Sequence, residues 1–109
     1  MPSYLVQVSY TQQALSALIA NPQDRTQALK KNVKNLGGKI TGSWFSFGEY
    51  DLVMVAEFPD NVSAAAWSLA VAGGGALKSV KTTPLLSIEE GLEALKKVPE
   101  SCYKSIVAS

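Results

Sequence analysis

The chain has no histidine and a single cysteine, Cys102, among its 109 residues. Histidine is the side chain that proteins use most often as a metal ligand and as a general base near neutral pH. One cysteine cannot form a disulfide within the chain, and without a histidine partner it lacks a common activator of a nucleophilic thiol. The composition therefore predicts no metal site and no cofactor.

The chain also lacks a marked excess of either charge, because its 10 lysine and arginine residues nearly balance its 9 aspartate and glutamate residues and leave a net charge of +1. Binding of nucleic acid or a membrane surface usually needs a marked positive excess, so we expect neither partner. The first residues resemble neither a signal peptide nor a long apolar anchor. Hydrophobic residues make up 47% of the chain, which excludes a disordered protein. A cytoplasmic protein of one domain is predicted.

The most informative stretch is residues 43–58, two runs rich in aromatic and β-branched residues that meet at Gly48. Glycine suits the first central position of a two-residue type II′ turn, so the pattern predicts a β-hairpin with Gly48 as its structural turn residue. The resulting register places Ser46 opposite Asp51. Because side chains alternate along a strand, both faces of the hairpin carry apolar residues. One face has Phe45, Phe47, Tyr50, Leu52, Met54 and Phe58, and the other has Trp44, Ser46, Asp51, Val53 and Val55.

The other elements are indicated by capping residues and by the period of the apolar side chains. Alternation predicts further strands over residues 3–10 and 76–86. Predicted helices begin at Thr11, Asn21, Asp60 and Ser87, and the third of them is predicted to turn Val62, Ala65, Ala66 and Leu69 toward the core. The order is β-α-β-β-α-β with an extra C-terminal helix, which predicts an α+β, ferredoxin-like fold: an antiparallel four-stranded sheet with its helices on one face. The domain is predicted to span residues 1–98, with a tail over 99–109.

A sheet with helices on one face normally presents a polar second face to water. Here Trp44, Val53 and Val55 would lie on that second face, and leaving them exposed would be costly. A second copy of the same sheet is the simplest cover, so we expect a homodimer or a higher homo-oligomer. The alternative is that the last helix or the tail folds over this face.

The sequence Gly48-Glu49-Tyr50-Asp51, which follows Trp44 and precedes Leu-Val-Met-Val-Ala-Glu-Phe-Pro-Asp, resembles the GYD-domain family of small bacterial and archaeal proteins. Residues 36–39 and 80–83 are also similar to that family, and the resemblance covers about residues 3–90. It implies a ferredoxin-like fold of the dimeric α/β-barrel type and no established activity. The glycine run at residues 73–75 and the long tail depart from a plain family member.

Asp51 is the leading candidate for a catalytic acid or base, because a partly buried carboxylate can have a raised pKa. The alternative is that Asp51 accepts hydrogen bonds from backbone N–H groups and stabilises the hairpin. Tyr50 is a second catalytic candidate through its hydroxyl. Trp44 and Ser46 share the face of Asp51, and with Thr82 they are candidates for ligand binding. For each of these residues, ordinary packing or strand propensity is the competing interpretation.

Two further patterns are weak. The glycine run at residues 73–75 ends a helix instead of opening one, and no phosphate-loop motif follows it. Lys30, Lys31, Lys34 and Lys39 have no interleaved aromatic residues and are best explained as a solvated helix face. Neither pattern changes the expectation about nucleic acid.

The leading functional hypothesis is a small homo-oligomeric domain that binds a small apolar or aromatic molecule between sheet and helices. One alternative is a cofactor-free monooxygenase or isomerase, by analogy with other dimeric α/β-barrel proteins. Another is a structural or regulatory interaction module. An enzyme needs Asp51 or Tyr50 to line a cavity, whereas an interaction module needs that cavity to be filled.

Overall fold

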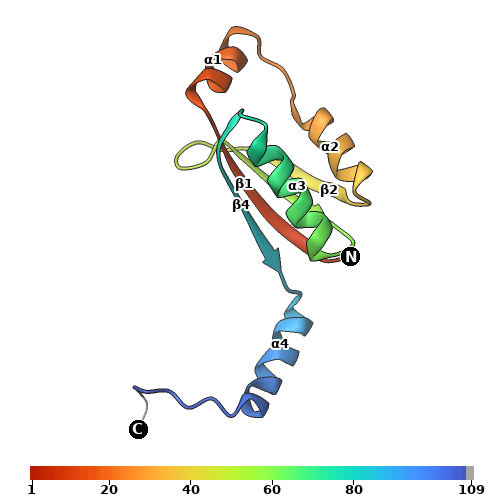
Figure 1. Ribbon diagram of the computed structural model, residues 1–109, viewed down its shortest axis with the longest axis vertical. Helices are drawn as coiled ribbons and strands as arrows, with labels where there is room; N and C mark the ends of the chain where they lie inside the picture. Colours follow the sequence, from red (N-terminus) through yellow and green to blue (C-terminus); the bar gives the residue numbers. More distant parts are fainter. Residues whose placement is uncertain (108–109) are drawn as a thin grey trace.

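A computed structural model describes residues 1–107 of the chain (Figure 1). The elements follow the predicted order. They are β1 (Ser3–Tyr10), α1 (Gln12–Ala20), α2 (Thr26–Asn35), β2 (Lys39–Phe45), β3 (Leu52–Glu57), α3 (Asn61–Gly73), β4 (Leu77–Leu85), α4 (Ile88–Lys97) and a 3₁₀ turn, η1 (Val98–Ser101).

The four strands form one antiparallel sheet in the order β2-β3-β1-β4. With α2 and α3 on one face, this arrangement confirms the predicted α+β, ferredoxin-like fold. Within the hairpin, Trp44 lies opposite Val53 and Phe45 opposite Leu52, as the sequence predicts.

The predicted two-residue turn at the end of this hairpin is wrong. The strands stop at Phe45 and Leu52, and a wider loop joins them. The reason is that β1 competes for the residues next to the turn: the Asp51 N–H donates to the Val8 carbonyl oxygen at 2.8 Å. Gly48 nevertheless adopts a positive φ of 124°, a backbone conformation that favours glycine.

The core lies between the sheet and the helices α2 and α3. Alternate residues of β1 and β3 are buried there, together with Val33 of α2 and Trp67 of α3. The Phe58 ring lies between two other aromatic rings. Its centroid is 5.7 Å from the centroid of the Tyr4 ring and 6.1 Å from the centroid of the Trp67 ring. The buried residues are Tyr4, Val6, Val8, Val33, Leu52, Met54, Ala56, Phe58, Ala64 and Trp67.

The face of α3 that enters the core is not the predicted one. Ala64 and Trp67 are buried, whereas Val62 and Leu69 are exposed. Apolar residues occur on all sides of this helix, so the hydrophobic pattern alone does not decide which side faces the sheet. The predicted caps at Thr11, Asp60 and Ser87 are confirmed, including the capping box that Ser87 forms with Glu90.

The segment between α1 and α2 also differs from the prediction. Asn21 ends α1 and does not begin a helix, because its N–H donates to the Ala17 carbonyl oxygen at 3.0 Å. The α2 helix begins at Thr26, whose N–H donates to the Asp24 carboxylate at 2.8 Å. No side chain of α1 is buried, and this helix lies beyond the end of the sheet (Figure 1).

The second face of the sheet, which we call the open face, has a central apolar strip and no helix over it. The register places Leu5, Val53 and Val55 there, and these three side chains are half-buried. Trp44 lies beside Val53 on β2 with 58% of its surface exposed. Its ring extends over Gly42, where a Cβ atom would stand 2.6 Å from the indole.

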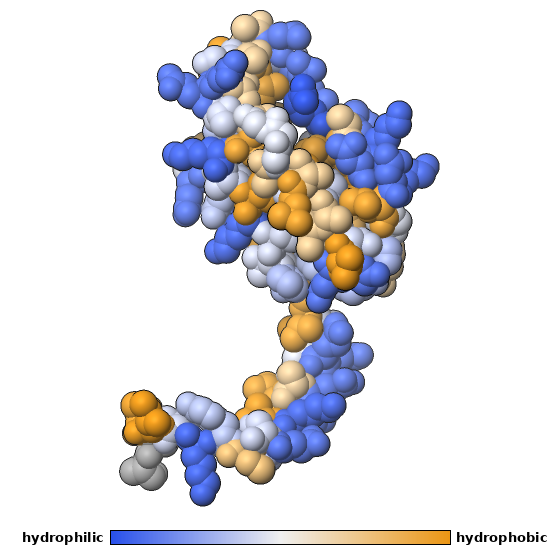
Figure 2. Space-filling view, in the orientation of Figure 1, coloured by the Kyte–Doolittle hydropathy of each residue, from blue (hydrophilic) through white to orange (hydrophobic). Residues whose placement is uncertain are grey.

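The last helix does not cover the open face. Instead, α4 continues away from the end of β4 (Figure 1). It is apolar on one side and hydrophilic on the other (Figure 2), and its apolar residues Ile88, Leu92 and Leu95 are all exposed. The alternative in which the last helix covers the sheet is therefore wrong for a single chain. Within residues 1–107, none of the helices is both long and apolar enough to cross a membrane.

Candidate functional site

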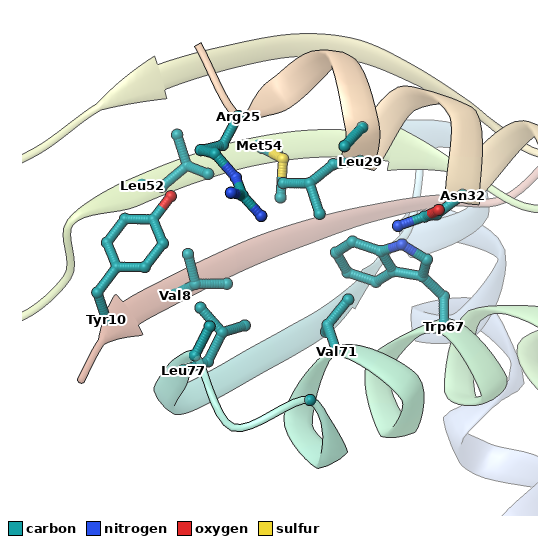
Figure 3. A pocket seen from close by; sticks show the side chains of 13 residues that line it. Val8, Tyr10, Arg25, Leu29, Asn32, Leu52, Met54, Trp67, Val71 and Leu77 are labelled. Atoms are coloured by element: carbon teal, nitrogen blue, oxygen red, sulfur yellow. The ribbon is translucent and has the colours of Figure 1, made fainter. Parts of the chain in front are cut away.

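A cavity of about 240 Å³ lies between the sheet and the helices α2 and α3 (Figure 3). Its floor is formed by strand residues whose side chains alternate toward the helices, such as Val8 of β1 and Met54 of β3. Leu29 of α2 closes one side, and Trp67 and Val71 of α3 close the other. The walls are therefore mainly apolar, which is typical of small-molecule sites.

Two polar side chains enter this cavity at the same end. The Tyr10 hydroxyl comes from the end of β1, and the Arg25 guanidinium comes from the residue that precedes α2 (Figure 3). Burial raises the pKa of Tyr10, the nearby charge of Arg25 lowers it, and the charge of Asp51 raises it further. The net pKa shift is upward, so the Tyr10 hydroxyl is neutral at pH 7 and can donate a hydrogen bond.

The indole of Trp67 forms part of the wall at the other end, near Asn32 of α2 (Figure 3). Trp67 is 2% exposed, and its buried Nε1–H group has no hydrogen-bond partner among residues 1–107. A buried donor without a partner costs about 1–3 kcal/mol. This donor is thus an unusual polar feature in a wall that is otherwise apolar.

Asp51 and Ser46, two of the predicted site residues, lie together in a different hollow. That groove lies between the hairpin end on one side and α1 with residues 22–24 on the other, and Tyr10 lines both the groove and the cavity. The Asp51 carboxylate accepts a hydrogen bond from the Tyr10 N–H at 2.9 Å. The Ser46 hydroxyl donates to the Tyr50 carbonyl oxygen at 2.8 Å. Both contacts hold the hairpin loop to itself and to β1.

The other predicted residues are not gathered at one place. Thr82 lies on the helix side of β4, where its hydroxyl is 2.8 Å from the Ser68 hydroxyl of α3. Trp44 lies on the open face, and Tyr50 is half-buried in the loop between β2 and β3. The structure therefore unites Asp51 with Ser46 and separates both from Thr82 and Trp44.

The polar residues of the cavity were missed because no local motif marks them. Tyr10 ends a strand in which it looks like one more alternating residue, and Arg25 lies in a connection whose helix start was misplaced. Trp67 was missed because the prediction turned the wrong face of α3 toward the core. A corrected phase for α3 is the signal that would have placed a tryptophan against the sheet.

Side chains that could hold a metal ion do not gather in the part of the chain that the structure describes. No cluster of three or more histidine, cysteine, aspartate or glutamate residues with metal-site geometry occurs within residues 1–107. Cys102 is a free, exposed thiol beyond α4.

The sheet order, the helices on one face and the cavity beneath them define an α+β domain of the ferredoxin-like class. Residues 4–95 match the family described as the GYD domain, and the chain belongs to that family. No curated protein matches the chain.

The chain is also similar to a solved structure described as "crystal structure of FFRP-DM1". The two share 12% sequence identity with a TM-score of 0.50, over 79% of this chain and 100% of that one. Identity this low supports the fold alone.

Proposed function

We propose that this GYD-domain protein is a homo-oligomeric binding domain that holds a small, largely apolar molecule in the cavity between the sheet and the helices α2 and α3. The observation that carries the proposal is the cavity itself. Small-molecule sites are concave and mostly apolar, with a few polar groups that fix the orientation of the ligand. A partly open space of about 240 Å³ with mainly apolar walls and the polar groups of Tyr10 and Arg25 at one end has this character.

The volume indicates the size of that occupant. An engineered apolar cavity of about 150 Å³ holds one benzene molecule. The cavity of this protein is larger than that one by roughly the volume of one short substituent. A single ring with a small side group therefore fits it. The apolar side chains of Leu29, Met54 and Val71 would lie against such a ring.

Binding is favoured over the alternative of a cofactor-free monooxygenase or isomerase. Tyr10 and Arg25 are the only titratable side chains among the residues that line the cavity. Arginine stays protonated in proteins, and the raised pKa of Tyr10 makes it a poor base near pH 7. The enzyme hypothesis requires Asp51 or Tyr50 to line the cavity, and neither does, because Asp51 lies in the neighbouring groove and Tyr50 lies in the loop between β2 and β3.

A cavity-filling variant tests the proposed binding. Val71→Phe adds a ring inside the cavity, whereas Ala72→Phe adds the same group at an exposed position on the next residue of α3. A ligand that binds the native state raises the melting temperature by mass action. We expect single-ring compounds such as phenylacetate, phenylacetamide and toluene to raise the melting temperature of the wild type and of Ala72→Phe.

In Val71→Phe the same compounds should give no shift. Circular dichroism and a cooperative melt would show that both variants are folded. Equal shifts in Val71→Phe would place the binding elsewhere, and no shift by any compound in the wild type would leave the cavity without a ligand of this class. Either result contradicts the proposal and favours an interaction module.

We further propose that the open face is covered by a second copy of the chain. The support is its central strip of Leu5, Val53 and Val55, which no helix or strand among residues 1–107 covers. A lysine in such an interface would be buried without a partner, so Val53→Lys should dissociate the oligomer. Val62→Lys is the matched control, because Val62 is 79% exposed on the outer side of α3.

Light scattering over a dilution series separates the outcomes. We expect a mass above 11.6 kDa for the wild type and for Val62→Lys, and the monomer mass for Val53→Lys. If Val62→Lys dissociates the oligomer and Val53→Lys does not, the contact lies on α3. A wild-type monomer at all micromolar concentrations would refute self-association.

A further inference from the structure

We infer that the molecule held in the cavity is a small carboxylic acid, bound with its carboxylate between Arg25 and Tyr10 and its ring against Trp67. This inference rests on the proposed binding function and adds the chemical class of the ligand. It is carried by the position of a cation and a neutral hydroxyl at one end of a cavity whose other walls are apolar (Figure 3).

Arg25 provides the charge. Its guanidinium points into the cavity from the residue before α2 (Figure 3). A guanidinium has five N–H donors in a planar fork that matches the two oxygens of a carboxylate. An anion at this end of the cavity would therefore have a bidentate partner already in place.

The side chain of Arg25 is also free of a structural task at the helix start. Arg25 is the residue that caps α2, but no side-chain hydrogen bond to the first turn is formed. Its carbonyl oxygen alone takes part, accepting from the Leu29 N–H. The side-chain hydrogen bond at the start of α2 comes instead from Asp24, whose carboxylate accepts from the Thr26 N–H. The Arg25 side chain therefore extends into the cavity without a role in capping (Figure 3).

Tyr10 provides a second donor. A tyrosine hydroxyl is ordinarily neutral at pH 7. Burial, helped by the charge of Asp51, raises the pKa of Tyr10 further, although the charge of Arg25 lowers it. A neutral phenol can donate to a carboxylate, whereas a phenolate would repel it. The Asp51 carboxylate is itself bonded to the Tyr10 N–H, in the adjoining groove. Tyr10 is thus fixed through its backbone while its hydroxyl remains directed at the ligand.

The opposite end of the cavity determines the rest of the ligand. Trp67, Val71 and Leu29 offer apolar surface here, and the polar groups at this end, the Trp67 Nε1–H and the Asn32 amide, carry no charge. A second charged group on the ligand would therefore lose hydration without meeting an opposite charge. The indole face favours an aromatic ring over an aliphatic chain of the same size. The predicted class is a monocarboxylate with one ring and a short spacer, of which phenylacetate is the simplest probe.

The experiment compares phenylacetate with phenylacetamide, which has the same shape and no charge. Calorimetric titrations are made with the wild type, Arg25→Gln and Arg25→Lys. A hydrogen bond to a charged group is about twice as strong as a neutral one, so we expect the wild type to prefer the acid by roughly tenfold. Arg25→Gln should abolish that preference, and Arg25→Lys should retain part of it because the charge remains without the fork.

Tyr10→Phe should lower the affinity for the acid severalfold and leave the affinity for the amide nearly unchanged. If the wild type binds both compounds equally and Val71→Phe binds neither, the cavity is a binding site but its ligand is not an anion. That result overturns this inference and leaves the proposed function standing. If neither compound binds the wild type, the proposed function fails and the inference fails with it.

Discussion

The two tryptophans lie on opposite faces of one sheet. Trp67 is 2% exposed between α3 and the strands, with its ring next to Phe58 and at the wall of the cavity. Trp44 is 58% exposed on the open face. The same residue type is therefore buried in the core on the helix side of the sheet and exposed to solvent on the open face.

The difference has a direct energetic meaning. Burying a tryptophan stabilises the chain that buries it, whereas an exposed tryptophan contributes only when a partner covers it. On the helix side the stability is intramolecular and independent of concentration. On the open side, stability would come from the proposed oligomer, and we expect that part to vary with the concentration of the chain.

The largest expected effect is the loss of Trp67. Trp67→Ala removes a ring that contacts the core and enlarges a cavity that already exists, so we expect the free energy of unfolding to fall by about 3–5 kcal/mol. Chemical denaturation, followed by circular dichroism, measures it. Trp67→Phe keeps part of the ring and should lose clearly less, which keeps the comparison measurable if Trp67→Ala does not fold.

Trp44→Ala is the matched variant on the open face. At dilutions where the chain is monomeric, we expect its free energy of unfolding to stay within about 0.5 kcal/mol of the wild-type value. At concentrations where the chain associates, the variant should be less stable than the wild type. A loss at high dilution as large as that of Trp67→Ala would show that a single chain already covers Trp44.

The contrast between the faces also explains which parts of the fold are predictable from sequence. Strand alternation in β1 and β3 is unambiguous, so the sheet, its order of elements and the pairing of Trp44 with Val53 follow from the pattern. Helix α3 has apolar residues all round, so either side could face the sheet, and Trp67 was missed. Which side is buried depends on packing against Phe58 and Tyr4, far away in the sequence.

An effect smaller than that of Trp67→Ala is expected at the end of the hairpin. Gly48 has a φ of 124°, and a side chain there would meet no atom within 4 Å. Gly48→Val therefore costs backbone strain without a clash, about 1–3 kcal/mol. Gly73→Val is the control, because Gly73 also has open space but lies in α3 without a positive φ. Equal midpoints of denaturation for Gly48→Val and the wild type would mean that the loop relaxes freely.

The candidate site was less predictable than the fold. Asp51, Ser46 and Thr82 are candidates because they are polar residues in an apolar strand region. This criterion does not distinguish side chains that form hydrogen bonds within the protein from side chains that bind a ligand. Asp51 bonds to β1, and Thr82 lies beside Ser68. The cavity is assembled from β1, β3, α2 and α3, so its lining becomes visible only when the helix phases and the tertiary packing are known.

A modest effect on stability is also expected at Asp51, which links the end of the hairpin to β1. Asp51→Asn keeps an oxygen that can accept from the Tyr10 N–H but removes the charge, so a charge-assisted hydrogen bond becomes a neutral one. We expect the free energy of unfolding to fall by about 1 kcal/mol. Glu49→Gln is the control, because the Glu49 side chain is exposed. Glu49 contributes to the loop through its backbone carbonyl oxygen, which accepts from the Ser9 hydroxyl and is unchanged in the variant.

The same variant decides between the two roles of Asp51. If Asp51 only fixes the loop, Asp51→Asn should bind phenylacetate as the wild type does, because its carboxylate lies in the groove beyond Tyr10 and not in the cavity. Removing a negative charge near Tyr10 should if anything favour the anion slightly. A folded Asp51→Asn protein that has lost binding altogether would give the carboxylate a direct part in the site. We expect unchanged binding, because the Asp51 carboxylate accepts a hydrogen bond from the Tyr10 N–H and thereby has a structural role.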